Sequence, residues 1–235
     1  YYLATRTFTL PELKILVDVV QSSRFITKSK SEELIHKLEN FANRYDGRQL
    51  QRQVYVSGRI KTMNESIYYS VNTIHAAISE NRKIKFQYYQ WNAKKEMELR
   101  HNGKWYHISP WGLLWDDENY YMIGFDSEAQ KIKHYRVDKM LKINLSEEPR
   151  DGKEAFSKLN MADYTKKSFG MYGGKEEKVK LLIHNDLVGV IIDRFGRDIM
   201  LFPADADHVT ANVDVRVSRQ FLAWVFSLGP NVKIL

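Results

Sequence analysis

Apolar and polar positions alternate with different periods along the chain, and the first third has the helical period. Leu13, Leu16 and Val17 recur at the spacing that puts apolar side chains on one face of a helix. The same spacing returns between residues 34 and 42, and again between residues 64 and 81. This part of the chain is therefore predicted to form amphipathic helices.

Two of these helices begin with the spacing of a capping box. Thr9 precedes Glu12 by three positions, and Ser29 precedes Glu32 in the same way. In such a box the first side chain accepts from the backbone of the fourth residue, whose carboxylate accepts from the first backbone amide. Thr9 and Ser29 are therefore predicted as the N-caps.

The period changes to two after residue 82, which predicts strands. Turn-forming residues such as Asn102-Gly103, Pro110 and Asp116-Asp117 separate the apolar stretches. The predicted strands are 83–88, 105–109, 113–115, 119–125 and 132–138. About five short strands after a helix predict a small SH3/Sm-like β-barrel.

The pattern then dissolves into a polar, glycine-containing stretch from Glu147 to Glu177, which predicts a linker with one short helix. Beyond it, strand and helix signals follow in the order β-α-β-β-α-β, with Ser218 as the cap of the second helix. This order is that of a ferredoxin-like module.

The predicted fold class is therefore α+β, in four segments. A helical connector occupies residues 1–62, a helix with the small barrel 63–147, a linker 148–177 and the C-terminal module 178–235. The chain begins with Tyr1 and stops within a predicted strand, so we expect both ends to be boundaries within a longer protein.

Composition narrows the class of protein. The 235 residues include no cysteine, which excludes disulfides and thiolate chemistry, and no apolar run approaches the ~18 residues that span a bilayer. A soluble, cytoplasmic protein without a membrane partner is expected. The formal net charge of +7 is compatible with a polyanionic partner but does not by itself predict one.

Residues 44–52 concentrate positive charge, and we interpret them as a solvated connector rather than a phosphate-binding segment.

The sequence lacks the usual signatures of an enzyme. Residues 170–175 are glycine-rich, but their spacing does not match a phosphate-binding loop and Glu176 occupies the place of its Ser or Thr. The histidines have no metal-ligand spacing, and neither a Gly-x-Ser-x-Gly elbow nor an isolated carboxylate pair occurs. No catalytic residue, metal or cofactor is predicted.

One set of polar residues suggests binding of an anion. Side chains alternate along a strand, so His134 and Arg136 share one face while Tyr135 and Val137 take the other. If the two strands are neighbours, a basic patch combines His107, Ser109, His134 and Arg136, rimmed by Tyr120 and Tyr121. Arginine offers a planar fork to phosphate, and tyrosine stacks on bases. The alternative is that Arg136 only pairs with Asp138 or a surface acid, and the sequence leaves both open.

Three blocks of the chain, 106–113, 120–124 and 134–140, resemble the WYL domain of bacterial transcriptional regulators. The Trp-Tyr-Leu triplet that names the family is replaced at residues 120–122 by Tyr-Tyr-Met. The family's closing pattern of Arg, aromatic, Arg, aliphatic, Asp, Arg is met at residues 134–139, with His134 and Lys139 as the substituted basic positions. Residues 209–235 resemble the C-terminal extension of these regulators. Residues 1–20 resemble the exit from their winged helix-turn-helix.

The resemblance implies a homodimeric regulator that binds DNA through an N-terminal helix-turn-helix missing from this chain. Its barrel would sense a nucleotide or single-stranded nucleic acid, while the helices and the C-terminal module dimerise. The implied ligand-binding residues are His107, Ser109, Tyr120, Tyr121, His134, Arg136 and Lys139. The alternative is an accessory protein, associated with a defence system, that binds single-stranded DNA or RNA directly.

Overall fold

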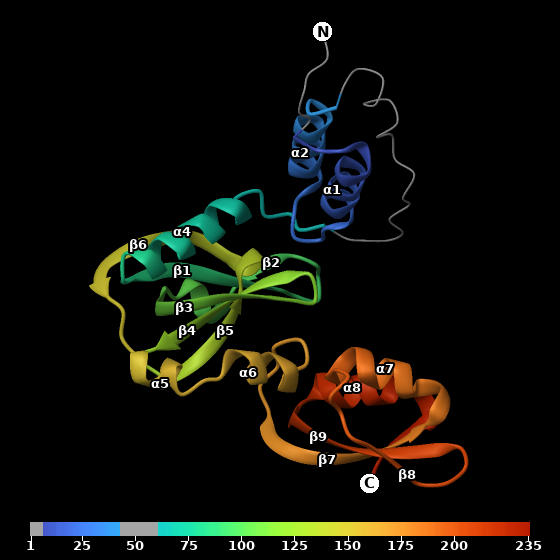
Figure 1. Ribbon diagram of the computed structural model, residues 1–235. Coiled ribbons are helices and arrows are strands. Elements are labelled where there is room, and N and C mark those ends of the chain that lie inside the picture. Colours follow the sequence, from blue (N-terminus) through green and yellow to red (C-terminus); the bar gives the residue numbers. More distant parts are fainter. Residues whose placement is uncertain (1–6, 43–60) are drawn as a thin grey trace. The chain divides into compact units, whose positions relative to one another are not determined.

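A computed structural model describes residues 7–42 and 61–235, without the side chains of residues 162 and 163. The basic segment 44–52 and the predicted exit from a winged helix at the first residues lie outside this range. The chain divides into two compact units, Tyr1–Lys153 and Glu154–Leu235. Its fold is α+β, with an N-terminal helical part, a curled antiparallel sheet and a second antiparallel sheet (Figure 1). Within the described residues, no helix combines the length and apolarity needed to cross a membrane.

The first unit begins with a helical hairpin of α1 (Leu10–Ser22) and α2 (Lys28–Glu39). The backbone amide of Thr9 donates to the Glu12 carboxylate at 2.7 Å, so this half of the predicted capping box is confirmed. The predicted cap of α2 is wrong, because the helix begins one residue after Thr27. Thr27 has an extended backbone, and its hydroxyl accepts from the Lys30 amide at 3.2 Å.

Helix α4 (Ile67–Ser79) packs against a curled antiparallel sheet. The strands are β1 (Arg82–Trp91), β2 (Met97–Leu99), β3 (Tyr106–Asp116), β4 (Asn119–Asp126), β5 (Lys131–Arg136) and β6 (Met140–Pro149). Their order is β2-β1-β3-β4-β5, and β6 pairs with β1. Short 3-10 turns occupy Arg100–Gly103 and Val137–Lys139. The core joins α4 to the inner face of the sheet through Ile74, Phe86, Ile108, Met122 and Val137.

The sheet differs from the prediction at Pro110 and at β6, and it also contains the unpredicted short strand β2. Pro110 does not end a strand, because β3 continues through it and the register with β4 shifts between Pro110 and Gly112. Such a bulge accommodates a residue that has no amide to donate. Strand β6 also extends to Pro149, into the stretch predicted as a polar linker. Its alternate residues are exposed, so polar side chains there are compatible with a strand.

The second unit is a four-stranded antiparallel sheet in the order β10-β7-β9-β8, with α7 and α8 packed on one face (Figure 1). The strands are β7 (Lys175–His184), β8 (Leu201–Pro203), β9 (His208–Val217) and β10 (Val232–Ile234). The helices are α5 (Lys153–Ser157), α6 (Met161–Lys167), α7 (Val188–Phe195) and α8 (Arg219–Ser227), with 3-10 turns at Asn185–Leu187 and Gly229–Asn231. The Ser218 hydroxyl accepts from the Phe221 amide at 3.2 Å, which confirms this predicted cap.

Part of the predicted linker belongs to the core of the second unit. Phe169 is 6% exposed and joins the cluster formed by the sheet, α7 and α8. The Arg194 guanidinium lies 3.9 Å from the centre of its ring and donates to the Ser168 carbonyl at 2.7 Å. Tyr164 and Met171 are buried as well. The segment therefore contributes to folding, although its sequence lacks a regular apolar period.

Replacing Phe169 with Ala tests this role. The change removes a buried ring and leaves a cavity, so we expect a loss of about 3 to 5 kcal/mol in the free energy of unfolding. Urea titration measures the loss, and hydrogen exchange should place it in β7 and β9. Tyr172→Ala is the matched control, because Tyr172 is 52% exposed and should cost little. Equal effects of the two changes would contradict the role of Phe169.

Candidate functional site

The end of β5 carries the alternation that the sequence predicts. Tyr135 and Val137 are buried in the core, while Arg136 and Asp138 are directed to the other side. The amide of Arg136 donates to the Tyr88 hydroxyl at 3.0 Å, which fastens the end of the strand to β1. The position of Arg136 is therefore fixed by its backbone as well as by its neighbours in the core.

Three side-chain bonds orient the Arg136 guanidinium. Its Nε and Nη2 donate to the two Asp138 carboxylate oxygens at 3.0 and 2.8 Å, and Nη2 also donates to Asn119 Oδ1 at 2.8 Å. Asn119 follows a two-residue turn, Asp117-Glu118, in which both φ angles are positive, as in a type I′ hairpin. The pairing with Asp138 that the sequence left open is therefore present. Nη1 makes no hydrogen bond within the part of the chain that the structure describes.

Arg136 lines a cavity of about 250 Å³, which we call the cationic hollow. Three cations outnumber two carboxylates around it, and two aromatic side chains contribute to its wall. The charged and aromatic lining residues are Arg24, Lys61, Arg136, Asp117, Asp138, Tyr89 and Trp91. Tyr89 is buried, but Trp91 is 47% exposed and its ring is accessible to a ligand. The arrangement suits a group that combines negative charge with a flat ring.

Lys139 lies close to this excess of positive charge without lining the hollow. Burial lowers the pKa of Lys139, and the positive charges of Arg136 and Arg100 lower it further, against the opposing effect of Asp138. Its ammonium has no hydrogen bond or ion pair with any described residue. A bound anion would stabilise the charged form of this amine.

The predicted convergence of His107 and Ser109 with His134 and Arg136 is not found. Strand β4 lies between β3 and β5, so the two pairs of residues are on strands that are not adjacent in the sheet. The register adds a further offset, because Ser109 pairs with Phe125, whereas Arg136 pairs with Tyr121. Strand neighbours are set by tertiary pairing, which the alternation within each strand does not reveal.

His107 lines a separate cavity of about 200 Å³ with Lys104 and Lys133. Both lysines there already have carboxylate partners, since Lys104 contacts Glu128 at 2.6 Å and Lys133 contacts Asp126 at 2.5 Å. This second cavity therefore offers less unpaired positive charge than the cationic hollow.

The remaining predicted residues take packing or neighbouring positions. Tyr121 is 8% exposed, so its ring is not available for stacking on a base. Tyr120 packs edge-on against Phe25 and Trp115, with ring centres 4.7 Å away in each case. His134 lies two residues before Arg136 on β5 and does not line the hollow.

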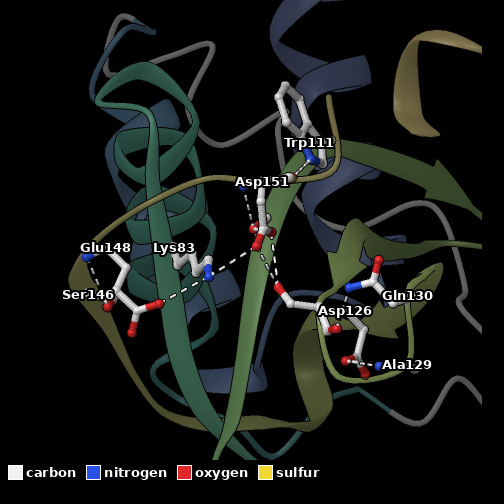
Figure 2. Close-up of polar contacts among 10 residues, drawn as sticks. Lys83, Trp111, Asp126, Ala129, Gln130, Ser146, Glu148 and Asp151 are labelled. Atoms are coloured by element: carbon white, nitrogen blue, oxygen red, sulfur yellow. Dashed lines mark hydrogen bonds and ion pairs between the residues drawn. The ribbon is translucent and has the colours of Figure 1, made fainter. Parts of the chain in front are cut away.

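Asp151, just beyond β6, is the centre of a polar network that includes Ser109; Figure 2 shows its contacts with Lys83 and Trp111. The Ser109 hydroxyl donates to the Asp151 carboxylate at 2.6 Å, and Ser127 donates to it at 2.8 Å. Lys83 contacts the same carboxylate at 3.2 Å, and the Trp111 indole donates to the Asp151 carbonyl at 2.8 Å. These bonds fasten the segment after β6 to β3 and to the β4–β5 turn.

The next residue shows how closely this segment approaches the sheet. Gly152 has a φ of +78°, and a Cβ placed on it would lie 2.1 Å from the Phe125 ring. Only glycine fits this conformation and this contact. Because Ser109 bonds Asp151, the residue before Gly152, it helps to hold this segment against the sheet and has a structural role.

Of the residues that line the hollow, only Arg136 was among the predicted ligand-binding residues; Arg24, Trp91 and Asn119 are examples of those that sequence reasoning missed. Trp91 is the last residue of β1, three residues past the end predicted for this strand. A tryptophan at the end of a strand, which is exposed in the structure, was the signal in the sequence that could have indicated a binding residue. Arg24 lies in the loop between α1 and α2, where no periodicity marks it. Among residues 7–42 and 61–235, no group of three or more His, Cys, Asp or Glu side chains has the arrangement to hold a metal ion.

Asp151→Asn tests the network through its pH dependence. Burial opposes ionisation of Asp151, but bonds from Ser109, Ser127 and Lys83 outweigh it and hold its pKa below the ordinary value of 3.8. Its ionised form therefore stabilises the fold above a pH of about 4, and this contribution is lost as pH falls through the lowered folded pKa. We expect the loss of unfolding free energy in the variant to be largest near neutral pH and to shrink below about pH 4.

Urea titrations of both proteins at a series of pH values measure this difference. Glu98→Gln is the control, because Glu98 is exposed on β2 and has no such network. A difference between wild type and Asp151→Asn that does not change with pH would contradict the role of the ionised carboxylate.

Comparison with known proteins bears on the first unit. Residues 70–145 match the WYL domain, a range that includes most of α4 and the sheet from β1 into β6. No curated protein matches the chain. Among solved structures, the chain is similar to proteasome accessory factor B/C (PafBC) of Arthrobacter aurescens, at 16% identity over 97% of this chain and a TM-score of 0.35. This chain covers 33% of the length of that one. The resemblance seen in the three sequence blocks is confirmed by the domain match, and the chain contains a WYL domain.

Proposed function

We propose that this chain is the effector-sensing region of a bacterial transcriptional regulator, and that its WYL domain binds a nucleotide or nucleic-acid-like anion in the cationic hollow. The proposal rests on the orientation of the Arg136 guanidinium in the hollow. Asp138 and Asn119 hold it in place, its Nη1 has no hydrogen bond to any described residue, and Trp91, whose ring is exposed, lines the same hollow. A preoriented guanidinium that presents its Nη1 donors to a hollow lined by an aromatic ring matches a phosphate attached to a base.

The size of the hollow limits the ligand. About 250 Å³ is below the roughly 300 to 1,000 Å³ typical of small-molecule pockets. We therefore propose that it receives one phosphate-bearing nucleotide, either free or at the end of a single strand. Asp117 and Asp138 on its wall disfavour a more highly charged anion without a counter-ion.

We propose finer architectural assignments for both units. The curled sheet with α4 is interpreted as an SH3/Sm-like barrel, and the second unit as a ferredoxin-like module. The second proposal is supported by the β-α-β-β-α-β order and by the strand order β10-β7-β9-β8 with antiparallel neighbours.

The regulatory part of the proposal rests on the family resemblance. DNA would be bound by a winged helix-turn-helix preceding this region, in a cytoplasmic homodimer dimerised through the helices and the C-terminal module. Occupancy of the hollow changes the regulator only if the ligand has different affinities for two arrangements of the dimer.

We propose binding without catalysis. The Asp138 carboxylate in the hollow is bonded to Arg136 through both oxygens and is therefore not positioned as a free general base. Nucleotides incubated with the protein should be recovered unaltered, and a hydrolysed product would contradict this part of the proposal.

Arg136→Lys tests the site while retaining the charge that faces Asp138. Lysine lacks the guanidinium that bonds Asp138 and Asn119 while presenting Nη1, so affinity should fall roughly 10- to 100-fold, because a charge-assisted hydrogen bond is worth about 1.5 to 3 kcal/mol. Isothermal titration with thymidine 5′-monophosphate, a 5′-phosphorylated oligodeoxythymidylate and inorganic phosphate measures the loss. These probes also distinguish a free nucleotide from a strand end.

Lys131→Gln is the control, since Lys131 is exposed at the start of the same strand. Unchanged affinity in Arg136→Lys, or absence of binding to all three probes, would overturn the proposed site. The accessory-protein alternative gains support if the full-length protein binds the single strand but no duplex DNA.

A further inference from the structure

One wall of the cationic hollow comes from outside the matched domain. Arg24 belongs to the loop between α1 and α2, and Lys61 belongs to the strap, residues 61–66, that leads into α4. The sheet side of the hollow includes Arg136, the last residue of β5, and Asp138 in the turn that follows. The hollow therefore exists only where the helical hairpin meets the sheet.

The loop is anchored beside the hollow by aromatic packing. Phe25 lies 4.7 Å from Tyr120 and 5.8 Å from Trp115, measured between ring centres. Trp115 and Tyr120 face each other across the β3–β4 hairpin, whose turn supplies Asp117 to the hollow. Packing of Phe25 therefore positions its neighbour Arg24 at the rim.

The strap fixes the hairpin by polar bonds as well. The Lys61 ammonium donates to the Ser23 carbonyl and the Ser31 hydroxyl, each at 2.8 Å, and to the Val20 carbonyl at 3.3 Å. The Thr62 amide donates to the Arg24 carbonyl at 2.9 Å. All three protons of Lys61 are thus occupied, and it contributes charge to the hollow rather than a bond to a ligand.

Arg24 differs from Lys61 because its guanidinium is unoccupied. It is exposed, and it makes no hydrogen bond or ion pair with any residue in the described ranges. Five N–H donors of a planar group therefore border a hollow whose other arginine also has a nitrogen, Nη1, without a hydrogen bond to any described residue.

We infer that the anion binds between two arginines, Arg136 of the sheet and Arg24 of the helical hairpin. This inference rests on the proposed function and adds its regulation. A ligand bound to both walls is bound more tightly when the hairpin is docked, so by reciprocity it stabilises docking. The hairpin lies N-terminal to the WYL domain. Ligand binding in the hollow therefore affects how firmly the N-terminal part of the chain is docked.

Arg24→Gln tests the inference with the 5′-phosphorylated oligodeoxythymidylate as the probe. The variant should bind about tenfold more weakly, because one charge-assisted contact is lost, and its melting temperature should be unchanged because the Arg24 side chain has no hydrogen bond or ion pair with a described residue. Lys28→Gln, an exposed cation on the same hairpin that does not line the hollow, should bind like wild type.

Hydrogen exchange of the wild type gives a second readout. The oligonucleotide should slow exchange at residues 23–27 and 61–66 as well as at the end of β5, and Arg24→Gln should lose only the first two effects. If Arg24→Gln binds normally while Arg136→Lys does not, the inference is overturned and the proposed function stands. If the wild type does not bind the oligonucleotide, thymidine 5′-monophosphate or phosphate, both are overturned.

Discussion

Arg136 and Asp138 form an ion pair at the end of β5, with 2.8 Å between Nη2 and Oδ2 and the Asp138 side chain 12% exposed. Partial burial of two charges costs solvation, which is offset only when geometry and additional hydrogen bonds are favourable. Both conditions hold, because the contact uses both carboxylate oxygens and Asn119 accepts a further bond. The guanidinium is thereby held rigidly, and its Nη1 has no bond to the part of the chain that the structure describes. Such preorganisation favours ligand binding.

This pair depends in turn on the core beneath it. Tyr135 and Val137 flank Arg136 in the sequence and are buried against Phe86 and Met140. A shift of β5 by one residue would turn them outward and bury the arginine, so the apolar contacts determine the register of the charged ones. Stability of the sheet and geometry of the hollow are therefore consequences of the same alternation.

The polar residues of the first unit fall into two groups with different physical roles. Around Asp151, hydroxyl and ammonium donors are satisfied by one carboxylate, and the network fastens the segment after β6 to β3. Around the hollow, cations exceed carboxylates and the Arg24 guanidinium has no described partner. A saturated network rigidifies a fold, whereas unpaired cations retain the capacity to bind an outside anion.

Most helices and strands, the alternation around Arg136, the capping role of Ser218 and the α+β class could be predicted from the amino-acid sequence. These are local properties, since each follows from the spacing of side chains within one element. Strand β6 and the core position of Phe169 were not predicted. Strand β6 is polar on its exposed face, and Phe169 lies in a glycine-containing stretch that has no regular apolar period. That β4 separates Ser109 from Arg136, and that Arg24 lines the hollow, became evident only from the folded structure. Strand neighbours and docked loops are set by contacts between residues far apart in the chain, and local periodicity carries no information about those contacts.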